Sequence, residues 1–263
     1  MKIAVPDPTL MGASNAYTSG FYFGIGTGAL RSARVILGVL FETYRPNSVL
    51  DIGCGQGAWL AAAEEFGCSH LVGVDGPWVD AAAMLSQRAI FSVANLESEI
   101  SFPERFDLCV SLEVAEHLSA ARAPGFVENL CSASDVVLFS AAVVQQGGTS
   151  HINEQWQSFW ARLFKVAGFE CYDLIRPRIW TDDTVDSWYR QNVLLYVNQS
   201  SPVAEALRRQ CLGRGPLDIV HPEIYEGNLE TFRRMIENPS LRFCREIIAR
   251  WCRKRLAAWI RVL

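Results

Sequence analysis

Between residues 48 and 198, short apolar runs rich in β-branched residues alternate with stretches whose apolar residues recur at helical spacing. The short runs lack the polar positions of a half-exposed strand, so we expect strands that are covered on both faces. A repeated strand–helix order is typical of an open, doubly wound α/β fold. The alternation therefore predicts a largely parallel sheet with helices on its faces.

Seven strands are expected, at residues 48–53, 70–75, 89–95, 106–112, 134–141, 169–175 and 192–198. Helices are expected at residues 29–44, 57–67, 78–87, 119–131 and 155–168. The last two strands are joined without an evident crossover helix, so one of them is expected to run antiparallel.

Composition divides the chain into three segments. Residues 1–28 are rich in Gly, Pro, Ser and aromatic residues and are expected to be irregular structure on the substrate side. Residues 29–200 form the predicted α/β domain, and residues 201–263 a helical C-terminal extension.

Charge is distributed unevenly along the chain. Residues 241–263 carry seven Lys or Arg and one Glu, a net charge of +6; the whole chain carries −4, so the rest carries −10. An acidic main body argues against nucleic acid as a partner. The basic segment has a helical apolar face, so it could bind a membrane surface or a protein, or pack on its own acidic domain.

The eight cysteines show no metal-finger spacing, and several lie in apolar runs. Reduced, mostly buried thiols in a cytoplasmic protein are therefore expected. The N-terminus has no long apolar stretch typical of a secretory signal. A monomer and a homodimer are both compatible with these features.

The segment "VLDIGCGQGAWL" joins an expected strand to an expected helix. Gly53, Gly55 and Gly57 allow a sharp turn and the close approach of a ligand, at the sheet edge where such folds bind ligands. The spacing is G-x-G-x-G and not the G-x-G-x-x-G of dinucleotide sites. Asp51 would repel a pyrophosphate and suits a ligand with an ammonium or sulfonium group. Asp75, which ends the next strand, can accept both hydroxyls of a ribose.

Three segments, "VLDIGCGQG", "VGVD" and "FDLCVSLEVAEHL", resemble the motifs of class I S-adenosylmethionine-dependent methyltransferases. The resemblance covers roughly residues 30–198. It implies a Rossmann-like, doubly wound seven-stranded sheet with an antiparallel last strand, in agreement with the strands counted above. It also implies S-adenosylmethionine as the cofactor and identifies the α/β domain as the methyltransferase domain.

The resemblance also assigns roles to single residues. Gly53 and Gly55 are expected to line the methionine part of the cofactor, and Asp75 to bind its ribose; the alternative for Asp75 is a helix cap. Asn95 matches the adenine-flanking position, with a simple turn as the alternative. The expected cofactor-binding residues are Asp51, Gly53, Gly55, Gly57, Asp75, Asn95, Leu96 and Leu112.

Polar residues follow the fourth strand in "SLEVAEHL". If a helix begins near Glu113, then Glu113, Glu116 and His117 share one face at i, i+3 and i+4. Three interpretations stay open: acids that favour a helix N-terminus, a general base, or ligands of a divalent cation. The loop after the fifth strand adds His151, close enough to reach the same chamber.

An "E-x-x-E-H" element with a later His resembles metal-assisted O-methyltransferases, among them small-RNA 2′-O-methyltransferases and ubiquinone-pathway enzymes. The expected metal ligands for Mg²⁺, Mn²⁺ or Zn²⁺ are Glu113, Glu116, His117 and His151. The expected catalytic residues are His151, His117 and Glu116.

Aromatic residues outside the strands predict the acceptor site. The expected substrate-binding residues are Tyr17, Tyr22, Trp156, Trp180 and Trp188. They could wall a chamber for a sugar or planar aglycone, or simply pack in the core. The predicted function is O-methylation of a hydroxyl on a small molecule. The alternatives are N- or C-methylation and a non-catalytic cofactor-binding protein.

Overall fold

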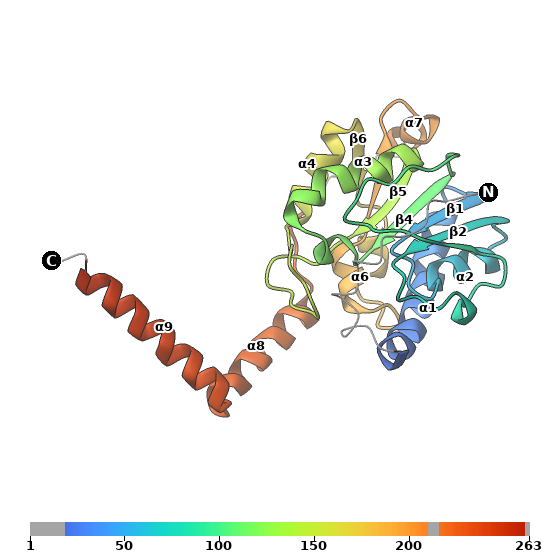
Figure 1. The fold of residues 1–263 in the computed structure, drawn as a ribbon. Helices are drawn as coiled ribbons and strands as arrows, with labels where there is room; N and C mark the ends of the chain where they lie inside the picture. The colour runs from blue at the N-terminus through green and yellow to red at the C-terminus, as the bar shows by residue number, and fades with distance from the viewer. Residues whose placement is uncertain (1–18, 210–215, 261–263) are drawn as a thin grey trace. The chain divides into compact units, whose positions relative to one another are not determined.

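The computed structural model describes residues 19–209 and 216–260 (Figure 1). One seven-stranded sheet has the strand order β3-β2-β1-β4-β5-β7-β6. The strands are β1 (Ser48–Ile52), β2 (His70–Asp75), β3 (Ile90–Val93), β4 (Leu108–Leu112), β5 (Val136–Ser140), β6 (Phe169–Tyr172) and β7 (Leu194–Asn198).

Strand direction confirms the predicted fold class. The pairs β1–β2, β1–β4, β2–β3 and β4–β5 are parallel, whereas β7 runs antiparallel to both β5 and β6. The chain therefore moves outward from β1 to β3, returns to β4, and continues to the other edge. This order places a topological switch point between β1 and β4, where open α/β sheets bind ligands beyond the carboxyl ends of their strands.

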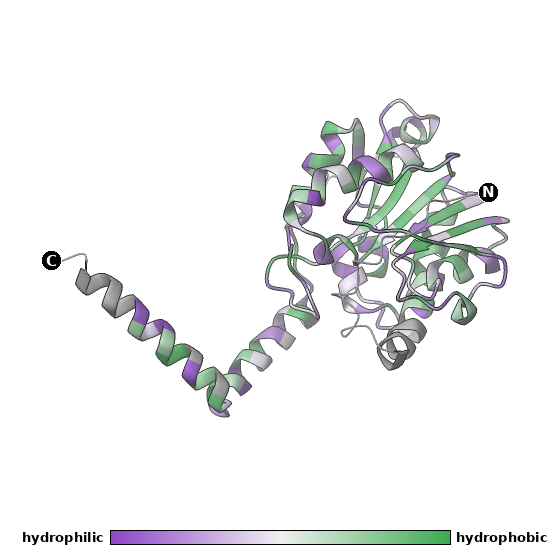
Figure 2. Cartoon of the chain, in the orientation of Figure 1, coloured by the Kyte–Doolittle hydropathy of each residue, from purple (hydrophilic) through white to green (hydrophobic). Residues whose placement is uncertain are grey.

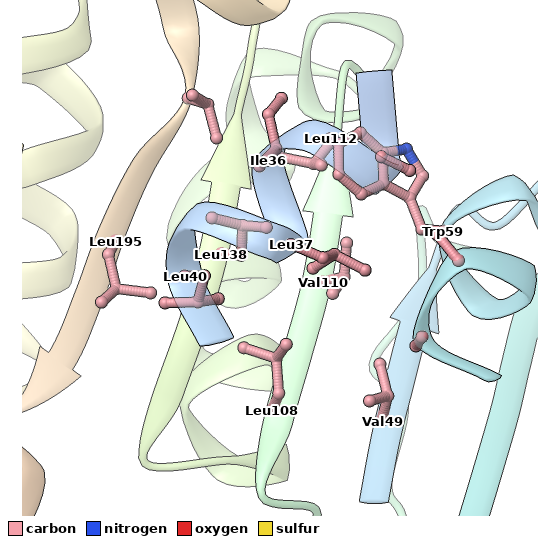
Figure 3. Packing of buried hydrophobic residues seen from close by; sticks show 14 of the residues in the cluster. Ile36, Leu37, Leu40, Val49, Trp59, Leu108, Val110, Leu112, Leu138 and Leu195 are labelled. Atoms are coloured by element: carbon pink, nitrogen blue, oxygen red, sulfur yellow. The ribbon is translucent and has the colours of Figure 1, made fainter. Parts of the chain in front are cut away.

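Two long helices pack over the centre of one face of the sheet. They are α1 (Ser19–Phe41) and α2 (Ala58–Glu65). Figure 3 shows their apolar side chains against alternate residues of the strands, with Leu37 near Val110 and the Trp59 ring near Leu112 of β4. Because every second residue of a strand points to this face, it receives Leu108, Val110 and Leu112 of β4.

The opposite face is covered by α3 (Ala123–Ala133) and α4 (Gln157–Val166). Here Cys109 of β4 joins Phe126, Trp160 and Phe164 in a second buried cluster. The central strands are thus buried on both sides, which is why their sequences show no polar alternation. Figure 2 shows this as hydrophobic colour along the strands of the sheet.

Two expected elements differ from the structure. Residues 19–28, expected to be irregular, have a helical backbone at the start of α1. Where a helix is expected at residues 78–87, the structure has only a 3₁₀ turn, Ala81–Ala83. All three of its alanines are exposed, so the turn does not pack on the core. An amphipathic helix needs a continuous apolar face to bury, and this segment buries only two apolar side chains, Val79 and Met84.

The remaining helices are α5 (Arg176–Ile179), α6 (Ser187–Asn192), α7 (Pro202–Arg209), α8 (Pro222–Glu237) and α9 (Leu241–Ile260). The described chain forms two compact units, which divide after His221. Ala204 and Leu207 of α7 are buried, and Tyr172 of β6 donates a hydrogen bond to the Ala204 carbonyl (3.3 Å). The second unit consists of α8 and α9. In neither described part of the chain is a helix long and apolar enough to cross a bilayer.

Candidate functional site

The loop after β1 lies where the switch point predicts a ligand site. Gly53, Gly55 and Gly57 have φ of 84°, 51° and 73°, in the left-handed region that glycine adopts without strain. The Gly53 N–H donates to the Val74 carbonyl (2.7 Å), which ties the loop to β2. A Cβ on Gly53 would lie 2.4 Å from the Val114 side chain, so the loop also packs closely on the segment after β4.

Two carboxylates flank this loop. Asp51 is 1% exposed and, within the described part of the chain, its Oδ2 has no hydrogen-bond partner. Burial, and then the charge of Asp75, hold the pKa of Asp51 well above its usual range. Burial also raises the pKa of Asp75, but hydrogen bonds from Gly55, Gly76 and Trp78 oppose that shift. A cationic group of a ligand would compensate the Asp51 charge.

We expect Asp51→Asn to stabilise the ligand-free chain by about 1–3 kcal/mol at pH 8 because it removes a buried carboxylate charge whose Oδ2 has no hydrogen-bond partner among the described residues. The pKa of Asp51 is higher in the folded than in the unfolded chain. The penalty is therefore absent below the ordinary aspartate pKa of about 4 and grows as pH rises. Urea denaturation at pH 5 and pH 8 measures the effect. A gain that is equal at both pH values would contradict this electrostatic explanation.

The other expected cofactor residues have mixed positions. The Asn95 side chain accepts from the Glu97 N–H (3.1 Å) and donates to Ser98 (3.2 Å), so it builds the turn after β3. Leu96 is buried in the second core cluster. Leu112 ends β4 and is buried beside α2. All three lie near the carboxyl ends of their strands, and their contact with a cofactor stays a prediction.

The acids and histidines after β4 come together without the helix near Glu113 that the sequence admits as one possibility. Glu113 has a φ of 56°, and only a 3₁₀ turn, Ala115–His117, follows it. One ligand atom from each of Glu116, His117 and His151 lies within 4.8 Å of the others. The rings of His117 and His151 meet edge to face, with centroids 4.9 Å apart. The 3₁₀ turn therefore brings the ligand atoms of Glu116 and His117 close to that of His151.

Main-chain hydrogen bonds bring His151 to this place. The N–H groups of Ile152 and Asn153 both donate to the Glu116 carbonyl (2.9 and 3.0 Å). The Ala142 N–H, just after β5, donates to Glu116 Oε1 (3.2 Å). The loops after β4 and β5 are therefore held together around Glu116, because their strands are neighbours in the sheet.

Burial shifts the pKa values of Glu116 and His117 in opposite directions. Glu116 is fully buried, and among the described residues its Oε2 has no hydrogen-bond partner. Burial, and then the charge of Glu113, raise the pKa of Glu116 well above its usual range. Burial and the neighbouring His151 lower the pKa of His117 to about 4, against a hydrogen bond to the Ser150 backbone. His117 is therefore neutral at pH 7, with a lone pair for a cation.

Glu154 orients His151. Its Oε1 lies 3.0 Å from His151 Nδ1 and accepts from the Gly147 N–H (2.7 Å), while its Oε2 accepts from the Gln145 N–H (2.8 Å). A carboxylate bound to one ring nitrogen leaves the other nitrogen for a ligand or a proton. The sequence places Glu154 three residues after His151 but does not reveal this contact.

Three side-chain amides near Glu113, the buried Gln191 and Asn192 and the half-buried Gln146, have no counterpart in the sequence-based expectations. Asn192 Nδ2 donates to Glu113 Oε1 (3.1 Å), and Gln146 Nε2 donates to Oε2 (3.3 Å). Gln191 Nε2 in turn donates to the side-chain oxygens of Gln146 and Asn192. The one sign of these amides in the sequence is "RQN", three polar residues directly before the apolar run of β7, where buried residues are expected.

The expected acceptor-site aromatics are not gathered into one wall. Tyr17 lies outside the described residues, and of Tyr22 only the backbone, in α1, is described. Trp180 packs on His221 (4.6 Å), whereas Trp188 contacts Tyr189 (5.9 Å) and Trp156 precedes α4. No ring contact joins these three tryptophans to one another in the described part of the chain. Their role in substrate binding stays a prediction.

A family model described as "Methyltransferase domain" matches residues 30–174. The ribosomal protein L11 methyltransferase of Methylobacillus flagellatus is 29% identical over 147 residues, which are 53% of this chain and 48% of that protein. The chain thus spans about half the length of this curated relative.

Solved structures show the same fold at low identity. An O-methyltransferase family protein from Burkholderia thailandensis aligns with a TM-score of 0.52 at 16% identity, over 70% of this chain and 58% of that one. A proposed O-methyltransferase from Nostoc punctiforme gives a TM-score of 0.51 at 14% identity, over 67% of this chain and 58% of that one. The alignments cover less than two thirds of either structure.

Proposed function

The chain belongs to the methyltransferase-domain family, and from this premise we propose that it methylates a hydroxyl oxygen of a small molecule such as a sugar, a glycoside or a secondary metabolite. It is an S-adenosylmethionine-dependent enzyme of class I, with the seven-stranded sheet of that class. What is proposed beyond this is the atom methylated, the acceptor and the residues that act.

The donor half of the proposal rests on the loop after β1. Gly53, Gly55 and Gly57 leave room for the methionine part, and Asp51 would face its ammonium group. Asp75, already an acceptor for the Gly55 N–H (2.8 Å), would bind the ribose hydroxyls. The sulfonium carbon would then face the segment after β4, which packs against Gly53 through Val114.

The acceptor half rests on one observation, the convergence of Glu116, His117 and His151 next to the donor loop. Methyl transfer needs the acceptor oxygen in line with the sulfonium carbon and a group that takes its proton. His151 is oriented for that role by Glu154. An amine acceptor needs no such cluster, since it can lose its proton to water before reaction.

These residues also fit a divalent cation. Carboxylate oxygens and neutral imidazole nitrogens suit Mg²⁺, Mn²⁺ and Zn²⁺. The buried Oε2 of Glu116, without a partner among the described residues, is an atom that a cation would satisfy. We propose Glu116, His117 and His151 as ligands, with Glu113 beside them, held by Asn192 and Gln146. A bound cation would act as a Lewis acid that lowers the pKa of an acceptor hydroxyl.

Metal removal provides the test. We expect EDTA to abolish turnover and one of Mg²⁺, Mn²⁺ or Zn²⁺ to restore it. Mass-spectrometric metal analysis of the chain should find about one ion per chain, lost in Glu116→Gln. His70→Ala, a change on the exposed start of β2, is the control and should retain the ion. Full activity in EDTA together with metal-free protein would leave His151 as a base without a cation.

Nitrogen methylation is the second candidate because the curated relative is a ribosomal protein methyltransferase. A turnover screen over sugars, nucleotide sugars, phenols, amines and ribosomal proteins separates the two. Methyl transfer to an amine or protein, unaffected by EDTA and by Glu116→Gln, would replace the oxygen proposal.

A further inference from the structure

The second compact unit, residues 222–260, exposes apolar side chains on both of its helices. On α8 the exposed apolar residues are Tyr225, Leu229, Phe232, Met235 and Ile236. On α9 they are Leu241, Ile247, Ile248 and Trp251. Trp251 is 59% and Ile248 60% exposed. Contiguous apolar surface of this kind marks an interaction site.

The described residues of α9 separate apolar from basic side chains. At about 100° per residue, Ile247, Ile248 and Trp251 fall within an arc of roughly 100° around the helix. Arg245, Arg250 and Arg253 fall outside this arc, and all three are exposed. None of these arginines forms an ion pair with any residue that the structure describes. The helix therefore presents an apolar strip flanked by free cationic groups.

Charge decides which occupant suits this strip. Residues 241–263 carry +6 and the rest of the chain −10, and the polar side of α8 is mainly acidic, with Glu223, Glu226, Glu230 and Glu237. By net charge, an anionic bilayer would attract residues 241–263 and repel the rest of the chain. A symmetric contact between two copies of α9 would place like charges against each other. Anionic lipid is the partner that satisfies both the apolar strip and the arginines.

We propose that α9 binds the surface of an anionic membrane. Ile247, Ile248 and Trp251 would enter the boundary between headgroups and acyl chains, and Arg245, Arg250 and Arg253 would contact lipid phosphates. The helix lies in the plane of the interface and does not cross the bilayer, in agreement with the absence of a spanning helix among the described residues. The proposal is independent of the methyl acceptor.

Vesicle co-sedimentation of the full chain tests it. We expect the chain to bind anionic vesicles made of phosphatidylcholine with about 30% phosphatidylglycerol. Binding to vesicles of phosphatidylcholine alone should be weak. Raising NaCl from about 0.1 to 0.5 M should reduce binding, because the Debye length shortens. Arg250→Glu/Arg253→Glu should lower the partition coefficient at least about 10-fold, since each basic residue near the surface contributes about a factor of five.

Matched variants on the first unit serve as controls. Arg162→Glu/Lys165→Glu makes the same change in net charge on α4, and Ile90→Gln/Val166→Gln removes two other exposed apolar residues. Neither control variant should weaken vesicle binding. Ile247→Gln/Ile248→Gln should weaken it, because this variant removes apolar side chains from α9. Circular dichroism verifies that each variant keeps its helix content.

Three outcomes would overturn the proposal. They are equal binding to neutral and anionic vesicles, equal losses in the α9 and control variants, and no binding at all. If sedimentation equilibrium instead shows a dimer that Ile247→Gln/Ile248→Gln dissociates, without lipid binding, the occupant of α9 is a second copy of the chain.

Discussion

Replacement of His151 by alanine is expected to lower the turnover number by about 10²–10⁴-fold while donor affinity changes less than about threefold. The side chain lies with Glu116 and His117 in one cluster and is oriented by Glu154, so its loss removes either the proton acceptor or a cation ligand. The donor loop is held by other contacts, chiefly to Val74 and Asp75, which the substitution leaves in place. Single-turnover methyl transfer and calorimetry with S-adenosylhomocysteine measure the two quantities.

His70→Ala is the matched control, because His70 is a partly exposed histidine paired with Glu104, and it begins β2 whereas the cluster follows the carboxyl ends of the parallel strands β4 and β5. It should keep both turnover and donor affinity. Full turnover in His151→Ala would remove this residue from the mechanism. A parallel loss of donor affinity would instead point to a structural effect of the substitution.

Asp75→Asn is expected to weaken donor binding by at least about 100-fold. Hydrogen bonds to a charged group contribute about 1.5–3 kcal/mol each, and the proposed ribose contact uses two hydroxyls. An asparagine has the same size, but its amide offers one acceptor oxygen in place of two. Calorimetry with S-adenosylmethionine and with S-adenosylhomocysteine measures the affinity.

Asp80→Asn makes the same change of charge on the same loop and should leave donor affinity unchanged, because Asp80 only caps the Ala81–Ala83 turn. Thermal melting without ligand separates binding from folding. This control is needed because the two oxygens of Asp75 accept from the Gly76 and Gly55 N–H groups (2.6 and 2.8 Å), and an amide nitrogen can accept from neither. Donor affinity within about threefold of the original would place the ribose elsewhere.

Regular elements could be predicted because their signals repeat within short windows. The seven strands lie within one to three residues of the expected ranges, and the antiparallel β7 follows from a connection without a crossover helix. The helix expected at residues 78–87 is wrong because its local signal was not supported by tertiary packing. "WVDAAAMLSQ" has good helix formers, but Ala81–Ala83 meet no core surface that would hold a helix.

Some parts of the candidate site could be predicted from local sequence, and others could not. Asp51, the three glycines and Asp75 are adjacent to strand ends, so strand positions alone bring them to one sheet edge. The left-handed backbone of Glu113, the pairing of Ile152 and Asn153 with Glu116, and the contact of Asn192 with Glu113 depend on how distant loops meet.

The sequence by itself determined the sheet, its order of strands and helices, and which polar residues stand at strand ends, because hydrophobic periodicity and glycine placement act locally. Sequence reasoning placed Glu116, His117 and His151 in one chamber, but only the tertiary structure decided how closely their ligand atoms approach, that Glu154 holds His151, and that Asn192 and Gln146 contact Glu113. These contacts join residues up to 79 positions apart. They form because β4, β5 and β7 are neighbours in the sheet, and no local pattern encodes that adjacency.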